Sequence, residues 1–122
     1  MFGFMISSVI AAGGDITAVK TQSEGNNLEH DLDLGAHASL VQVDSDTYAL
    51  AYTGTGTDGF ISTFTISSDG TTITKVDSLE HDTELASRNS LVQVDSDTYA
   101  LAYTGTDSDG FISTFTIDSD GN

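Results

Sequence analysis

Residues 39–70 read SLVQVDSDTYALAYTGTGTDGFISTFTISSDG, and residues 90–121 read SLVQVDSDTYALAYTGTDSDGFISTFTIDSDG. The stretches differ at only three of 32 positions, and the offset between them is 90 − 39 = 51 residues. The differing pairs are Gly56/Asp107, Thr57/Ser108 and Ser67/Asp118. Self-similarity at this period is typical of architectures in which one unit cannot bury its apolar face without a neighbour. The chain is therefore predicted to be built from tandem copies of one unit.

The similarity extends towards the N-terminus. The tetrapeptide LEHD at 28–31 recurs at 79–82, again 51 residues on, while the segments that follow have diverged, as exposed connections do. Residues 4–19 are similar to 61–76 and are predicted to be a decayed strand, turn and strand. The sequence thus predicts a partial repeat at 1–27, a complete one at 28–82 with its preceding connection, and an incomplete one at 83–122.

Within each repeat, hydrophobic residues alternate with a period of two, which is typical of strands. In TYALAYT, residues 47–53, the Tyr and Leu side chains share one face and the two Ala side chains share the other. Four antiparallel strands are expected, at 39–43, 47–53, 60–67 and 72–76. Because neither face is polar, each sheet is predicted to lie between others, its bulky face against the thin Ala face of the next.

The run LVQVDSDTYALAYTGTDSDGFISTFTIDSDG combines apolar strands, Asp-Gly turns, a Gly-x-Asp loop and an I-D-x-D-G ending. It resembles a blade of the YVTN and lactonase-type β-propellers and, more loosely, a kelch blade. The resemblance implies an all-β fold of tandem four-stranded antiparallel blades, about two repeats in an incomplete ring. A two-sheet β-sandwich is the alternative. Because a closed propeller needs about four blades or more, the chain is predicted to be a homo-oligomer or a fragment of a longer repeat chain.

The composition limits the possible partners. Nineteen acidic residues against three basic ones give a net charge of −16, so neither nucleic acid nor an anionic membrane surface is an expected partner. The absence of cysteine excludes disulfides and thiol chemistry. The first 14 residues lack the basic start of a signal peptide, and their apolar run is too short to span a bilayer, so no membrane insertion is expected. We expect an extracellular or cell-surface location.

In propellers of this kind, the loop between the second and third strands opens on the same side as the connection to the next blade. The resemblance specifies architecture only; we predict separately that this loop face binds a protein or a glycan, with no catalytic residues. Its candidate ligand-binding residues are His30, Asp58, His81, Arg88, Asn89, Asp107 and Asp109. One alternative is a fragment of a metal-dependent lactonase-type hydrolase, although two near-identical blades lack an asymmetric catalytic cluster. Another is a structural repeat of a longer surface protein.

Three sets of residues allow more than one interpretation. The Asp-x-Asp-Gly segments 107–110 and 118–121 offer the oxygen ligands of a calcium site, but they are also ordinary turn sequences, and the turn is favoured. No other cofactor is expected. The repeated Glu-His-Asp could bind a metal, but its recurrence at equivalent positions favours a structural role. The four tyrosines are expected in the core rather than stacked on sugars.

Overall fold

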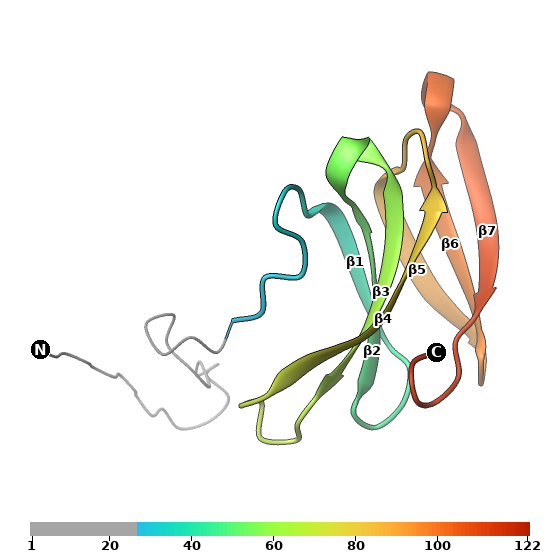
Figure 1. Ribbon diagram of the computed structural model, residues 1–122. Helices are drawn as coiled ribbons and strands as arrows, with labels where there is room; N and C mark the ends of the chain where they lie inside the picture. The colour runs from blue at the N-terminus through green and yellow to red at the C-terminus, as the bar shows by residue number, and fades with distance from the viewer. Residues whose placement is uncertain (1–26) are drawn as a thin grey trace, which may run out of the picture.

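The computed structural model describes residues 27–122, which form two antiparallel sheets lying face to face (Figure 1). The first sheet has the order β1-β2-β3-β4 and the second the order β5-β6-β7. The strands are β1 (Ala36–Gln42), β2 (Thr47–Thr53), β3 (Gly59–Ile66), β4 (Ile73–Asp82), β5 (Ser87–Asp95), β6 (Thr98–Thr104) and β7 (Gly110–Thr116). The all-β class is confirmed, with four strands in one sheet and three in the other. The propeller ring stays a prediction, and the strand unit expected at 4–19 lies outside the described residues.

The fourth strand is longer than the predicted 72–76. Strand β4 continues through Asp82, because Leu79 pairs with Ile61 and Glu80 with Phe60 beyond an irregularity in the β3–β4 register. The LEHD segment at 79–82 is therefore the end of a strand, whereas the sequence pattern placed it at the start of a connection. A bulge of this kind lets a ladder continue past residues that break the alternation.

Equivalent turns in the two repeats have the same backbone geometry. In the β2–β3 loop, the Gly54 N–H donates to the Asp58 carbonyl at 2.9 Å, and in the β6–β7 loop Gly105 donates to Asp109 at 2.8 Å. The residue two positions after each glycine, Gly56 or Asp107, has a φ of 78° or 60°. Glycine adopts this left-handed conformation without strain and aspartate tolerates it, which explains one of the three differences between the repeats.

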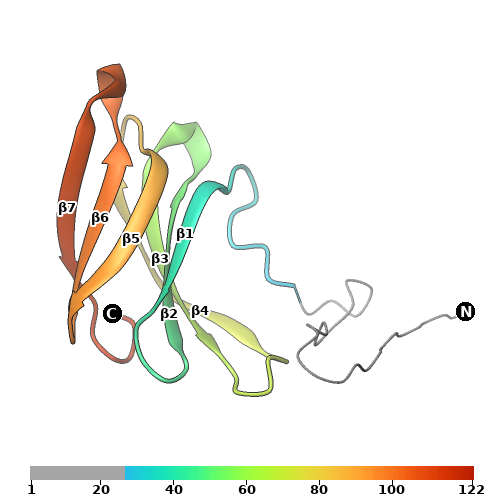
Figure 2. The same ribbon diagram turned by 180° about the vertical axis from the view of Figure 1, so that it is seen from behind.

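The core lies between the two sheets (Figure 2). The first sheet contributes small side chains, Ala49 and Ala51, whereas the second contributes bulky ones, Tyr99, Leu101 and Tyr103. All five are buried. The predicted packing of a bulky face against a thin Ala face is therefore confirmed at this junction.

Hydrogen bonds between the sheets fix how they are aligned. The Leu91 N–H donates to Ser39 Oγ at 3.0 Å. Two threonine hydroxyls of the first sheet donate to carbonyls of the C-terminal turn: Thr47 to Ser119 at 3.0 Å and Thr63 to Gly121 at 2.5 Å. Because Thr47 and Thr63 are buried, these bonds satisfy polar groups that would otherwise destabilise the junction.

Candidate interaction surfaces

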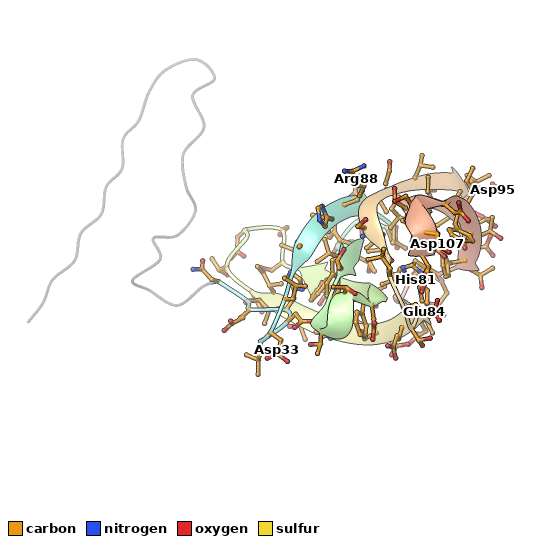
Figure 3. The ribbon with its side chains drawn as sticks, turned by 90° about the horizontal axis from the view of Figure 1, so that it is seen from above. Asp33, His81, Glu84, Arg88, Asp95 and Asp107 are labelled. Atoms are coloured by element: carbon orange, nitrogen blue, oxygen red, sulfur yellow. The ribbon has the colours of Figure 1, made fainter. Side chains whose placement is uncertain are left out.

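The connection between the sheets folds back onto the β2–β3 loop. The Ala86 N–H donates to the Thr57 carbonyl at 3.1 Å, and the Thr57 hydroxyl donates to the Glu84 carbonyl at 3.2 Å. The β2–β3 loop and the connection from β4 to β5 thus meet at one end of the molecule, as predicted. Figure 3 looks down on this end and labels Asp33, Glu84 and Asp107. Asp58 lies beside Glu80, and this neighbouring carboxylate raises the pKa of Glu80.

The predicted site residues do not converge at this end. Figure 3 shows Arg88 on the opposite side of the molecule from Asp33 and Glu84. Asn89 is buried and points towards the first sheet, where its Nδ2 donates to the His37 carbonyl at 3.2 Å. Asp107 and Asp109 lie in the β6–β7 loop, and Asp58 lies in the corresponding β2–β3 loop. Among residues 27–122, no three His, Cys, Asp or Glu side chains are grouped so as to hold a metal ion.

The two histidines of the repeated LEHD segment cover aromatic side chains. The His81 ring meets Tyr103 edge to face at 5.1 Å between centroids and Phe115 at 5.7 Å. His30 does the same on the first sheet, at 4.5 Å from Tyr52 and 6.4 Å from Phe64. Burial lowers the pKa of His81, and neither of its ring nitrogens has a hydrogen-bond partner. The His81 ring therefore packs in the junction between the two sheets, and its nitrogens are not exposed at the loop end.

The aspartates of the same segment hold the connections that follow them. Asp82 Oδ1 accepts from the N–H groups of Glu84 at 2.9 Å and Leu85 at 3.3 Å, and its Oδ2 accepts from the Tyr103 hydroxyl at 3.1 Å. Asp31 accepts from the N–H groups of two following residues in the same way. Burial raises the pKa of Asp82, but these donors outweigh it and the pKa lies below its ordinary value. The contacts support a structural role for the His and Asp residues of the Glu-His-Asp motif.

The Asp-Gly segments at the opposite end are held by local hydrogen bonds. Asp69 Oδ1 accepts from the Ser67 hydroxyl at 2.7 Å and from the hydroxyl and N–H of Thr71 at 2.8 and 3.1 Å. These donors lower the pKa of Asp69 to about 2. Asp118 Oδ1 accepts from the N–H groups of Asp120 and Asn122 at 3.0 and 2.9 Å. The contacts at 118–121 support the turn interpretation that the sequence favours, and calcium binding stays the less favoured alternative.

Each sheet also has an outer face on which some large apolar side chains are exposed. On the first sheet, Leu40 pairs with Leu50 and Tyr48 with Phe64, so that all four share one face, here called the Leu40 face. It carries a shallow groove of about 160 Å³, which Leu28 and His30 also line. On the second sheet, Ser90 and Ile112 both pair with Ala102, and Val92 with Ala100; this is the Ile112 face.

These outer faces were not among the sites that the sequence predicted. Leu40 is 58% exposed and Ile112 is 78% exposed, large values for residues on regular strands. A signal was present: near-identical repeats have near-identical faces, so a stack of two sheets leaves one face of each kind uncovered. The resemblance to propeller blades instead placed the predicted ligand-binding residues at the loop end.

A second opening lies between the sheets, beside β7. This cleft of about 330 Å³ is lined by apolar side chains, among them Ile61, Leu79, Phe115 and Ile117, and by polar ones, among them Thr63, Asp77 and Ser78. It occurs where the second sheet, in the part of the chain that the structure describes, has no strand opposite β4. The cleft is thus a consequence of the unequal number of strands in the two sheets.

Comparison with known proteins yields no relative: no protein-family model, no curated protein and no solved structure matches the chain. Within residues 27–122, no helix is long and apolar enough to cross a membrane.

Proposed function

We propose that the protein is a non-enzymatic interaction module that binds protein partners through the outer faces of its two sheets. One observation carries the proposal: Leu40 and Ile112, on opposite sides of the molecule, are mostly exposed members of apolar sheet faces. Large apolar patches exposed on a protein surface mark interaction sites, because isolated domains seldom leave them uncovered. Desolvation of these faces supplies the binding energy, and shape complementarity between strands supplies the specificity.

The loop end is the weaker candidate for recognition. Its carboxylates are partly engaged within the molecule, as in the bonds from the Thr55 hydroxyl to Asp33 and from the Thr106 hydroxyl to Glu84. Three of the four tyrosines are buried, which leaves only Tyr48 partly open for stacking on a sugar ring. These observations favour a protein partner over a glycan.

The hydrolase alternative needs an acid–base pair or ligand set directed at one point. The predicted site residues instead divide between the two loops, the β5 edge and the junction between the sheets. The third alternative, a structural repeat of a longer surface protein, would also bind its neighbours through these two outer faces.

A peptide-display experiment tests the proposal. The purified chain is used to select ligands from a random peptide library, in parallel with screening on a glycan array and on ester and lactone substrates with added calcium or manganese. We expect apolar, strand-forming peptides whose binding is lost in Leu40→Asp or Ile112→Asp but retained in Asp58→Asn. Retention of a defined glycan, or turnover of a substrate, would overturn the proposal.

A further inference from the structure

We propose that the partner is a second copy of this chain, which packs its Ile112 face onto the Leu40 face of the first copy, head to tail. The inference rests on the proposed function and specifies its partner. It starts from the fact that the molecule already contains one example of this contact, the junction between its own two sheets.

The internal junction shows what each outer face is built to do. Ile61 is 5% exposed where the first sheet meets the second, and its counterpart 51 residues on is Ile112, at 78%. Leu91 is 7% exposed on the other side of that junction, and its counterpart is Leu40, at 58%. The Leu40 face is thus the same surface that the second sheet uses to cover the first. The Ile112 face is likewise a copy of the surface that is covered.

The hydrogen bonds of the junction can also be repeated between copies. The three hydrogen bonds from Leu91, Thr47 and Thr63 described above have counterparts on the outer faces, with the same side chain wherever a side chain takes part. The predicted bonds between copies run from Leu40 N–H to Ser90 Oγ, from Thr98 Oγ1 to the Ser68 carbonyl and from Thr114 Oγ1 to the Gly70 carbonyl.

One bond cannot be repeated. Asn89 donates to the His37 carbonyl across the internal junction, and its counterpart, Ala38, has no donor in its side chain. The contact between copies is therefore expected to be weaker than the internal one.

The Leu40 face already has the local structure of a covered surface. His30 lies on Tyr52 and Phe64 as His81 lies on Tyr103 and Phe115. Residues 28–31 thus occupy, on the first sheet, the place that the end of β4 occupies on the second. A second copy would meet a face that needs little rearrangement, which reduces the cost of association.

Charge opposes the association. Each copy carries a net charge of −16, so two copies repel each other over about a Debye length, roughly 10 Å at 0.1 M salt. Added salt should therefore strengthen the contact, whereas it would weaken one that depends on ion pairs. Because the contact joins two different faces, it generates either a closed ring or an open stack, and not a symmetric dimer.

The test uses three variants of the whole chain: Leu40→Asp, Ile112→Asp and a matched control, Leu32→Asp. Leu32 is 84% exposed in the connection before β1, and its counterpart Thr83 is exposed even beside the internal junction. Sedimentation velocity is measured at concentrations of order 100 µM, in about 0.1 M and about 0.5 M NaCl. Circular dichroism melts show which variants are folded.

We expect the wild type and Leu32→Asp to form assemblies that grow with salt. Each face variant alone should be monomeric, with association weakened at least about tenfold. An equimolar mixture of the two face variants should form one-to-one dimers, because each supplies the face that the other has lost. An unfolded variant could not form these dimers. Dimers in the mixture would therefore show that each single variant is monomeric because it lost one face, and not because it unfolded.

Three results would overturn the inference. They are a wild type that stays monomeric in high salt, a mixture that does not form dimers although both variants are folded, and an association that only one of the two variants abolishes. If the wild type is monomeric but selected peptides still depend on Leu40 and Ile112, only the identity of the partner is wrong. If neither copies nor peptides bind, the proposed function fails as well.

Discussion

Ile61 and Ile112 occupy the same position of two strands that share the sequence GFISTFT, yet one is buried and the other exposed. Leu40 and Leu91 form the reverse pair, exposed in the first sheet and buried in the second. Local sequence cannot account for these differences, because the neighbouring residues are the same. Burial here is a property of position in the stack: each sheet has two apolar faces, and the molecule covers only one of each kind.

Truncation of matched leucines gives the largest expected difference between the sheets. Leu101 is fully buried at the junction, whereas its counterpart Leu50 is half-buried on the Leu40 face. Leu101→Ala should lower the free energy of unfolding by about 3–5 kcal/mol, and Leu50→Ala by only about 1 kcal/mol in dilute solution. Urea denaturation measures both. Equal losses would show that the Leu40 face is covered in solution.

Removal of a matched serine hydroxyl should have a smaller effect. Ser39 Oγ accepts the hydrogen bond from the Leu91 N–H, so Ser39→Ala leaves that donor without a partner and should cost about 1–2 kcal/mol. Ser90 is the exposed counterpart, and Ser90→Ala should have almost no effect on a monomer. If Ser90→Ala instead weakens association at high concentration, the contact proposed between copies is strengthened.

The pH dependence of stability should depend partly on His81. Burial holds its folded-state pKa below the ordinary value of about 6.5, while Asp82 acts in the opposite direction. Below pH 6.5 the unfolded chain therefore takes up a proton that the folded chain does not, and stability falls until the pH reaches the folded-state pKa. Denaturation midpoints between pH 7.5 and 5.5 should decline less steeply in His81→Gln than in the wild type. The same decline in both would mean that His81 does not contribute.

The smallest effects are expected at two bulge positions, which serve as an internal control. His37 and Arg88 are exposed counterparts with positive φ angles of 50° and 56°. Replacement of either by glycine relieves strain but adds freedom to the unfolded chain, so each change should alter stability by less than about 0.5 kcal/mol. The two effects should be equal, since neither side chain lies in the core. A large difference, measured by thermal melts, would mean that the repeats differ in backbone as well as in burial.

The sequence predicted the parts of the fold that depend on local pattern. The alternation in TYALAYT predicted the bounds of β2, the turn residues predicted the hairpins, and the pairing of bulky with thin faces was visible in Ala49 and Leu101. The length of β4 was missed, because its pairing beyond Val76 depends on an irregular register that no alternation reveals.

The sequence was less informative about sites. His81 and Asn89 were expected at a loop surface, but the stacking of the sheets turns both towards the junction. Polar residue type alone could not distinguish a ligand from a contact between layers. Which copy of each face is open also could not be read, because repeats with the same sequence differ only in what lies next to them.

Because equivalent residues of the two repeats form the two kinds of face, the sequence is constrained in how it can evolve. A substitution at the same position of both repeats would change the same side of the internal junction and of the proposed contact between copies. A bulkier residue at Ala49 and Ala100 would therefore have to be matched by a smaller one on the opposing faces. A duplicated block of 51 codons, by contrast, would insert a sheet whose two faces already fit its neighbours. The Ser39–Leu91 bond and the packing around it thus make lengthening of the stack far easier than gradual redesign of its faces.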